Sequence, residues 1–121
     1  MTSSRPEPIG VFEVVDSMNL TRLVGLFADH ASVTFANAAP LVGRDAIRSG
    51  IGQIYNRLQG LSHVLLHVWE PDEHTIVQAD VTYHLLDGRH TTCPATTIYR
   101  IDAAGLIDEY RVFVDLTPLN D

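Results

Sequence analysis

The sequence predicts an α+β fold in which three helices come first and an antiparallel meander of four strands follows. Apolar residues recur at helical spacing over much of residues 7–59, whereas residues 63–116 are rich in Val, Ile, Thr and Tyr. Three short connections, at residues 70–73, 87–88 and 102–105, are typical of hairpin turns. The sheet is therefore expected to curl over helices that cover one of its faces.

Two helices and a short strand are expected before residue 36. Apolar residues recur at helical spacing over residues 7–18, and Pro8 stands in a first-turn position that tolerates proline. Asn19 is a suitable N-cap for a second, short helix that ends near residues 29–30. A brief strand over residues 31–35 follows.

The third helix has the clearest period in the sequence. From Ile47 to Leu58, apolar residues fall at i, i+4, i+7, i+8 and i+11, and Gly60 is the expected C-cap. The four strands of the meander are expected at residues 63–69, 75–86, 91–101 and 106–116.

The charged residues exclude several classes of function. The chain has 121 residues, with eight arginines, no lysine, 15 carboxylates and a formal net charge of −7. Without lysine, Schiff-base chemistry and a P-loop nucleotide site are excluded. Scattered arginines on an acidic chain also argue against nucleic-acid and membrane-surface partners. Cys93 is the single cysteine, so an internal disulfide is impossible and a cysteine-based zinc site is not expected.

One domain is expected from the length. Residues 1–6 should form a flexible N-terminus and residues 7–121 a single domain, since domains typically have about 100 to 200 residues. No apolar run approaches the roughly 20 residues that span a bilayer, and the N-terminus lacks the apolar stretch of a signal peptide. A cytoplasmic location is therefore expected.

The order of elements and several short segments resemble one superfamily. These segments are Val-Asp at residues 15–16, Leu-Phe-Ala-Asp-His-Ala-Ser-Val at 26–33, Gly-Arg-Asp-Ala-Ile at 43–47, Gly-Leu-Ile at 105–107 and Tyr-Arg-Val-Phe-Val-Asp at 110–115. They are similar to the nuclear transport factor 2-like superfamily, which includes the SnoaL-like polyketide cyclases. The resemblance implies a cone-shaped α+β barrel. Because the superfamily contains isomerases, dehydratases, cyclases, epoxide hydrolases and proteins that only bind ligands, function must be argued from the pocket.

Two enzyme sites of the superfamily are absent from the sequence. A ketosteroid isomerase site needs a tyrosine and two carboxylates, and the matching positions hold Val11, Phe35 and Thr97. A limonene-epoxide hydrolase site needs an Asp-Arg-Asp set, of which the chain keeps only Asp80. Gln78 replaces the arginine and Val112 replaces the second aspartate. Neither activity is expected.

A third template, scytalone dehydratase, matches better. It uses an aspartate near the end of the first helix and two histidines, which Asp16, His63 and, with a gap of a few residues, His84 match. The tyrosine before that aspartate is replaced by Val15. An alternative role for Asp16 is to hold the turn into the second helix.

Hairpin geometry gives an argument that does not depend on resemblance. A two-residue turn at 87–88 sets Asp80 opposite Ala95, and a four-residue loop at 70–73 sets His63 opposite Asp80. Opposed residues have Cβ atoms roughly 5 Å apart, within reach of a hydrogen bond. Since residues two apart share a face, one face is expected to carry His63, Asp80, Thr82, His84, Thr97 and Tyr110. A one-residue change in loop length would turn His63 away from Asp80.

A His-Asp pair inside an apolar cone suits acid-base chemistry. Desolvation raises the pKa of a carboxyl group toward the range useful for a general base, although an adjacent imidazolium opposes that rise. Such a pair can take a proton from carbon or water and return it to a departing hydroxyl without a cofactor. The alternative is that Gln78, Asp80, Thr82 and His84 form only the polar face of a half-exposed strand.

Other residues are assigned to the pocket, to a metal or to an interface. The expected pocket residues are Phe12, Phe35, Asn37, Tyr55, Thr82, Thr97, Tyr99, Tyr110 and Val112. His63 and His67 stand four apart, which on a strand separates their Cα atoms by roughly 13 Å, so no metal site is expected. The resemblance implies a homodimer through the sheet, with a contact formed by Leu65, Trp69, Val81, Tyr83 and Leu85.

Together these observations favour a cofactor-independent SnoaL-like enzyme, either a dehydratase, an isomerase or a cyclase. The expected ligand is a small apolar metabolite of polyketide, steroid or terpenoid type. Asp80 is the expected general base or acid, His63 its partner, and His84 and Asp16 secondary residues that orient a water or a substrate oxygen. The alternative is a non-catalytic ligand-binding or accessory domain on the same fold.

Overall fold

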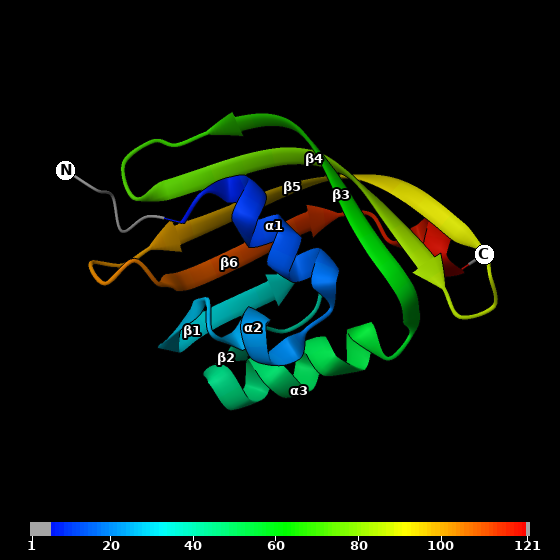
Figure 1. Ribbon diagram of the computed structural model, residues 1–121, viewed down its shortest axis with the longest axis horizontal. Coiled ribbons are helices and arrows are strands. Elements are labelled where there is room, and N and C mark those ends of the chain that lie inside the picture. Colours follow the sequence, from blue (N-terminus) through cyan, green and yellow to red (C-terminus); the bar gives the residue numbers. More distant parts are fainter. Residues whose placement is uncertain (1–5, 121) are drawn as a thin grey trace.

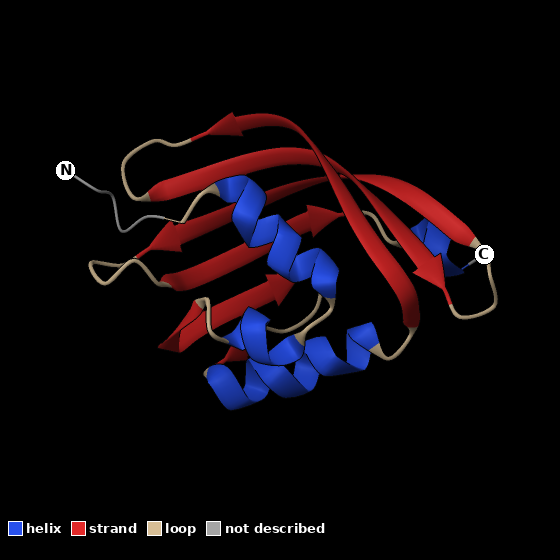
Figure 2. Ribbon diagram, viewed as in Figure 1, coloured by secondary structure: helices blue, strands red, loops and turns tan. Residues whose placement is uncertain are grey.

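A strongly curved mixed sheet forms one layer of the structure, and three α-helices lie on one side of it (Figures 1 and 2). The structure, a computed structural model, describes residues 6–120. The helices are α1 Pro8–Ser17, α2 Leu20–Val24, α3 Arg44–Tyr55 and a final 3₁₀ helix, η1 Thr117–Asn120. The strands are β1 Phe27–Phe35, β2 Leu41–Val42, β3 Leu58–Trp69, β4 His74–Leu85, β5 His90–Ile101 and β6 Ile107–Val114. The predicted α+β class and cone-like curvature are confirmed.

The flexible segment predicted for residues 1–6 falls mostly on residues 1–5, which lie outside the described residues. None of the helices within residues 6–120 is long and apolar enough to cross a membrane.

The short helix α2 begins as the sequence predicts. The Asn19 side chain accepts a hydrogen bond from the Arg22 backbone N–H at 3.1 Å, which is the geometry of an N-cap. The helix ends at Val24, five residues before the predicted end, and β1 starts at Phe27 instead of at residue 31. Phe27 is buried, so extending the strand to this point adds a large aromatic side chain to the core.

Gly60 does not cap α3, and that prediction is wrong. The helix ends at Tyr55, with Asn56 as its C-cap, and Gly60 lies within β3. The buried Leu58 already pairs with Leu85 of β4. Sheet pairing thus ends the helical pattern one turn early.

One pair of strands is parallel, which the predicted meander did not include. The strand order is β2-β1-β6-β5-β4-β3, and β1 pairs with β6 in parallel, with Val33 opposite Tyr110. All other neighbouring strands are antiparallel. The pairing of the first and last long strands brings Tyr110 against β1, next to the helices.

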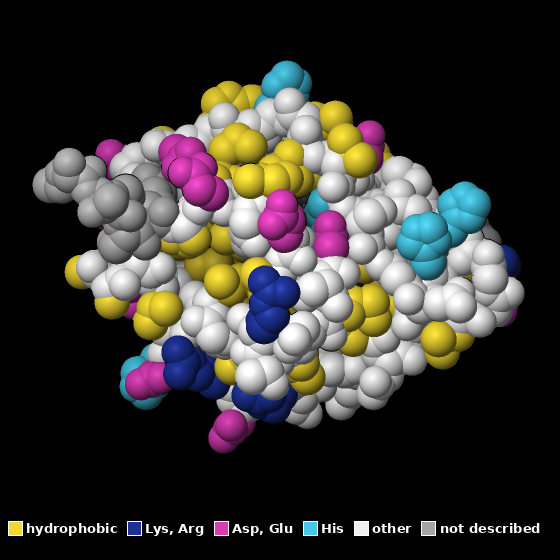
Figure 3. All heavy atoms as spheres, viewed as in Figure 1, with side chains coloured by type: hydrophobic (Ala, Val, Ile, Leu, Met, Phe, Trp, Pro, Cys, Tyr) yellow, Lys and Arg dark blue, Asp and Glu magenta, His cyan; other side chains and the backbone are white. Residues whose placement is uncertain are grey.

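The two faces of the sheet differ sharply in burial. On β4 the buried residues are Thr75, Val77, Ala79, Val81 and Tyr83. The residues between them are exposed or half-buried. We call the face with the buried residues the inner face, because α1 and α3 pack there through buried side chains such as Phe12 and Ile47. Figure 3 views the helical side, where hydrophobic side chains reach the surface in patches and arginines gather over α2 and α3.

The first hairpin has a different register from the predicted one. His63 lies opposite Val81, and Asp80 lies opposite Val64. Between Leu65 and His67 the strand β3 contains one more residue than β4, which is a β-bulge. One extra residue turns every side chain beyond it to the other face. The predicted contact between His63 and Asp80 is therefore wrong.

The second hairpin is shifted by one residue as well. The Leu85 N–H donates to the Arg89 carbonyl, which encloses a three-residue loop, and Gly88 takes a positive φ of 90°. A two-residue turn of the type predicted needs a positive φ at Asp87 too, but Asp87 is not among the described residues with positive φ. Asp80 consequently faces Pro94 and not Ala95.

The homodimer through the sheet remains a prediction, but its expected contact residues need correction. Val81 and Tyr83 are buried on the inner face beneath the helices, so they cannot reach a second sheet. Leu65 packs against the same core. The large apolar side chains that are exposed on the outer face are Val64, Trp69 and Phe113.

The burial difference between two isoleucines tests where the core lies. Ile47 on α3 is 0% exposed, whereas Ile9 on α1 is 56% exposed. We expect Ile47→Ala to lower the free energy of unfolding by about 2 to 5 kcal/mol, because it removes buried methyl groups and leaves a cavity. Ile9→Ala should change it by less than about 0.5 kcal/mol. Urea denaturation of both variants measures the difference, and equal effects would contradict this packing.

Candidate active site

Three of the predicted polar site residues lie on the outer face, away from the helices. The Thr82 hydroxyl is within hydrogen-bond distance, 2.9 Å, of the Thr92 hydroxyl on β5. The ring of His84 lies 5.8 Å from that of His90. Asp80 is flanked by Val64 and Pro94 on the neighbouring strands. Asp80, Thr82 and His84 thus form the polar face of a half-exposed strand. This was the alternative to a catalytic face in the sequence analysis.

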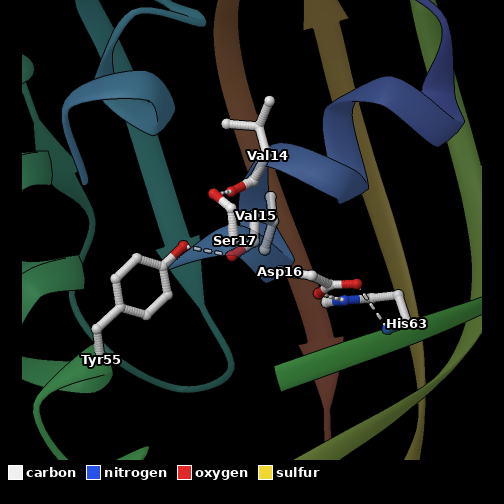
Figure 4. Close-up of polar contacts among 6 residues, drawn as sticks. All are labelled: Val14, Val15, Asp16, Ser17, Tyr55 and His63. Carbon is white, nitrogen blue, oxygen red and sulfur yellow. Dashed lines mark hydrogen bonds and ion pairs between the residues drawn. The ribbon is translucent and has the colours of Figure 1, made fainter. Parts of the chain in front are cut away.

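His63 lies on the inner face, and its partner is Asp16. The Nδ1 atom of the His63 ring is 2.5 Å from the Asp16 Oδ1 atom. The backbone N–H of His63 donates a second hydrogen bond, of 2.8 Å, to Asp16 Oδ2. The His63 side chain is 9% exposed and the Asp16 side chain 22%, so the pair is largely shielded from bulk water. Figure 4 shows the two side chains pointing at each other, from α1 and β3.

The last turn of α1 is held in place by further contacts around Asp16. The Ser17 hydroxyl donates to the Val14 carbonyl at 2.6 Å, and the Tyr55 hydroxyl of α3 donates to the Val15 carbonyl at 2.8 Å (Figure 4). Met18 ends the helix in the left-handed conformation, with φ of 56°. Because two hydrogen bonds fix the backbone beside Asp16, its carboxylate is fixed relative to β3.

An apolar cavity lies between the inner face and the helices, and His63 is part of its wall. Its volume is about 60 Å³, enough for a few water molecules or a small part of a ligand. The lining side chains are Val15, Leu23, Phe27, Val33, Phe35, Ile51, Ile54, Tyr55, Leu58, Leu61, His63, Val81, Tyr83, Tyr110 and Val112. No Asp, Glu or Arg is among them. His63 is the one histidine in a lining that otherwise consists of aliphatic and aromatic side chains.

A larger, open cleft adjoins this inner cavity. It has a volume of about 790 Å³ and lies between α3, the turn from β4 to β5, and η1. Phe35, Ile54, Leu58 and Tyr83 line both hollows. These four side chains therefore separate the cleft from the His63 cavity. Movement of these side chains would open a path for a ligand between the two.

Burial keeps the cavity tyrosines protonated. Burial raises the pKa of Tyr83 to about 12, with a smaller contribution from Cys93. The pKa of Tyr110 is raised by burial and by the nearby Tyr55 and Tyr99, against a lowering hydrogen bond with Thr97. Burial, followed by the Asp16 charge, also raises the pKa of Tyr55. Each hydroxyl can thus act as a hydrogen-bond donor at neutral pH.

The predicted pocket residues divide into three groups. Those that line the inner cavity are Phe35, Tyr55, Tyr110 and Val112. Those buried in the adjoining core without lining it are Phe12, Thr97 and Tyr99. Thr82 is on the outer face, and Asn37 is exposed in the loop before β2, so both assignments are corrected. The Phe12 ring packs on the ring of His63, with centroids 4.7 Å apart.

Sequence reasoning missed Tyr83 as a cavity residue. Its place was predicted on the outer face, because the hairpin register was shifted by one. The signal that could have found it is the run Val77, Ala79, Val81 and Tyr83, an apolar set with strand period that marks the buried face.

The described part of the chain offers little to bind a metal. Within residues 6–120, no three His, Cys, Asp or Glu side chains lie together as possible metal ligands. His63 and Asp16 supply two donors that already bind each other.

The raised tyrosine pKa values predict a loss of stability at alkaline pH. An unfolded tyrosine loses its proton near pH 10, whereas folded Tyr83 keeps it to about pH 12. The unfolded state therefore binds fewer protons in this window, and stability falls as pH rises. Urea denaturation at about pH 9 and about pH 11 should show this fall, and Tyr83→Phe should make it smaller. A free energy of unfolding that stays constant between these pH values would contradict the burial of these hydroxyls.

Solved structures support the fold at low sequence identity. A protein with a ketosteroid isomerase-like fold from Catenulispora acidiphila, in complex with trimethylamine, has 17% identity and a TM-score of 0.83, covering 93% of this chain and 88% of that chain. SalBIII, an epoxide hydrolase/cyclase-like enzyme of pyran ring formation in the polyether salinomycin, has 16% identity and a TM-score of 0.79, covering 90% and 88%. TerC, co-crystallised with polyporic acid, has 9% identity and a TM-score of 0.80, covering 93% and 91%. At these identities the likeness shows the fold alone.

A comparison with curated protein sequences finds no match. The model of the SnoaL-like domain family matches residues 10–110, which is most of the chain. The predicted resemblance is therefore confirmed, and the chain belongs to the SnoaL-like domain family.

Proposed function

We propose that the protein is a cofactor-independent acid-base enzyme of dehydratase, isomerase or cyclase type. Its substrate is a small, largely apolar metabolite of polyketide, steroid or terpenoid type. The observation that carries the proposal is the pairing of Asp16 with His63 at the wall of an apolar cavity. In this proposal His63 is the proton-transfer residue, and Asp16 is the positioning residue.

In this proposal the contact between the His63 ring and the Asp16 carboxylate selects the ring nitrogen that reacts. An ionised carboxylate only accepts hydrogen bonds, so Nδ1 at 2.5 Å from Asp16 Oδ1 carries the proton. The remaining ring nitrogen, Nε2, then has the lone pair. Because His63 lines the cavity and its Nδ1 side is occupied by Asp16, Nε2 is the nitrogen available to a ligand there.

Proton transfer through Nε2 accounts for the three reaction types. Nε2 takes a proton from a carbon next to a carbonyl group, and the imidazolium that forms is stabilised by the Asp16 carboxylate. Return of this proton to another carbon completes an isomerisation, and its return to a departing hydroxyl completes a dehydration. In a cyclisation the carbanion attacks a second carbonyl carbon and breaks its C=O π bond, and the alkoxide oxygen that forms takes the proton back from Nε2.

Tyr110 is suited to hold the substrate oxygen. It lines the same cavity as His63, and its raised pKa keeps its hydroxyl protonated. A donor in a water-poor cavity stabilises the negative charge that develops on a carbonyl oxygen when the neighbouring carbon loses a proton. The hydrogen-bond partner of the Tyr110 hydroxyl is the Thr97 side chain, which can itself donate, so the Tyr110 proton can go to a ligand. Tyr55 is less suited, because its hydroxyl already donates to the Val15 carbonyl, which can only accept.

The cavity wall supports an uncharged reacting group. No Asp, Glu or Arg side chain lines it, and burying an unpaired charge there would cost far more free energy than an apolar contact gains. The solved structures of a cyclase-like enzyme and of a protein with a ketosteroid isomerase-like fold are compatible with this chemistry on the same fold.

Three substitutions test the proposed roles. On a panel of β-hydroxy ketones and β,γ-unsaturated ketones, followed by enone absorbance, His63→Gln should lower kcat by about 10² to 10⁴. Asp16→Asn should lower kcat by about tenfold or more, since it removes the charge that orients and stabilises the imidazolium. Asp80→Asn is the matched control on the outer face, and its kcat should stay within about twofold of that of the unaltered protein.

A His63→Gln variant that folds, binds ligand and turns over at full rate would remove His63 from the mechanism. A large loss in Asp80→Asn would instead return the chemistry to the outer face. Circular dichroism and thermal unfolding of each variant show whether it is folded.

The second candidate function is ligand binding without catalysis. The observation in its favour is that the cavity wall is almost wholly apolar. It carries Val15 and Val112, which replace the tyrosine of the scytalone dehydratase template and an aspartate of the limonene-epoxide hydrolase template. Ligand affinity without turnover by the unaltered protein, for every compound in the panel, would favour this function.

A further inference from the structure

The open cleft has apolar walls and a polar rim. Its walls include Leu41, Leu85, Leu116 and Leu119, and its rim carries Gln53, Asn56, Arg57, Asp87 and Arg89. The end of α3, the turn from β4 to β5, and η1 lie at the same end of the molecule, on the right in Figure 1. Such a combination suits a ligand with an apolar body and a polar end group.

The charges on the rim are unequal. Arg89 Nε lies 2.7 Å from Asp87 Oδ2, and the Arg89 backbone N–H donates to Asp87 Oδ1 at 3.0 Å. These bonds lower the pKa of Asp87, so its carboxylate is ionised and matched by Arg89. Within residues 6–120, no carboxylate oxygen lies within 4.0 Å of a guanidinium nitrogen of Arg57. The lining of the cleft therefore carries one cation in excess, on a chain whose net charge is −7.

Two carbonyls in the last turn of α3 already accept backbone hydrogen bonds near Arg57. The last carbonyls of α3 would attract a cation, because they form the negative end of the helix. The N–H of Asn56 donates to the Gly52 carbonyl, and the N–H of Arg57 donates to the Ile54 carbonyl. The Arg57 side chain is exposed and lines the cleft, so it can reach a ligand there together with the amides of Gln53 and Asn56.

We propose that the cleft binds the acidic group of an amphipathic carboxylate, with Arg57 as its cationic partner. The apolar body of this ligand extends inward past Phe35 and Tyr83, toward the His63 cavity, whose wall holds no Asp, Glu or Arg side chain. The inference rests on the proposed function, since it specifies the substrate class of that site. It orients the substrate with its acid at the mouth and its reacting carbon inside.

Perillic acid and perillyl alcohol form a probe pair that tests this orientation. They share one terpenoid body and differ only in a carboxylate or a hydroxymethyl group. Isothermal titration calorimetry at low salt should show perillate bound about fivefold more tightly than the alcohol, the gain expected of one partly exposed charge-assisted contact. Added sodium chloride should weaken perillate binding and leave alcohol binding unchanged.

Arg57→Gln should abolish the preference for the acid while keeping the affinity for the alcohol. Arg48→Gln is the matched control, because Arg48 is an exposed arginine of α3 that does not line the cleft. It should keep the preference. Equal affinities for the acid and the alcohol in the unaltered protein, a preference that persists in Arg57→Gln, or the absence of binding of both probes would overturn the proposal.

The same titration separates this inference from the proposed chemistry. His63→Gln should retain the preference for perillate, because Arg57 and not His63 contacts the acid. Loss of turnover in His63→Gln with equal probe affinities would support the chemistry and overturn the Arg57 site. Unaltered turnover in His63→Gln, with a preference for perillate that depends on Arg57, would support the Arg57 site and overturn the proposed role of His63.

Discussion

The Asp16 carboxylate joins the end of α1 to β3 through two hydrogen bonds from one residue, His63. A carboxylate that is largely shielded from water is stable only when its oxygens are hydrogen-bonded, so this contact constrains both elements at once. It holds the last turn of α1 against the inner face of β3, and it orients the imidazole. The Tyr55 hydroxyl adds a third bond to the same turn of α1, and thereby ties α3 to this junction (Figure 4). The cavity wall is built around these contacts.

One extra residue in β3 decides on which face His63 lies. Near the turn, Trp69 of β3 pairs with Ile76 of β4, and this register would place His63 opposite Thr82, on the outer face. The bulge between Leu65 and His67 shifts the pairing by one, so that His63 lies opposite the buried Val81. Bulges often redirect a side chain in this way beside functional sites. The Asp16 contact and the bulge therefore depend on each other.

The fold could be predicted from the sequence because its signals are local and repeated. The helical period from Ile47, the N-cap Asn19, and the alternation along β4 each reflect a physical preference that acts over a few residues. Local signals could not predict two features, the parallel pairing of β1 with β6 and the end of α3 at Tyr55. Both depend on pairing between segments that are far apart in the chain. The resemblance to SnoaL-like proteins supplied the curvature of the sheet.

The site was predicted only in part, and the reason is register. His63 and Asp16 were both named, but His63 was paired with Asp80, because a four-residue loop at residues 70–73 followed by regular pairing would place them opposite each other. In the structure Trp69 pairs with Ile76 beside a longer turn, and the bulge in β3 then shifts the pairing again. The sequence around Leu66 carries no glycine or proline that would mark a bulge. The turn from β4 to β5 encloses three residues instead of the predicted two, so Asp80, Thr82 and His84 were assigned to the wrong face and Tyr83 was not assigned to the cavity. Register changes in two separate hairpins thus account for these errors.

The tautomer of His63 tests the central claim most directly. Long-range ¹H–¹⁵N correlation spectra of the protein, labelled with ¹⁵N at histidine and recorded where the ring is neutral, separate a protonated from an unprotonated ring nitrogen. Our account predicts a proton on Nδ1 and a lone pair on Nε2, with the Nε2 resonance shifting when a ligand enters the cavity. A proton on Nε2, or an Nε2 resonance that no ligand moves, would contradict it.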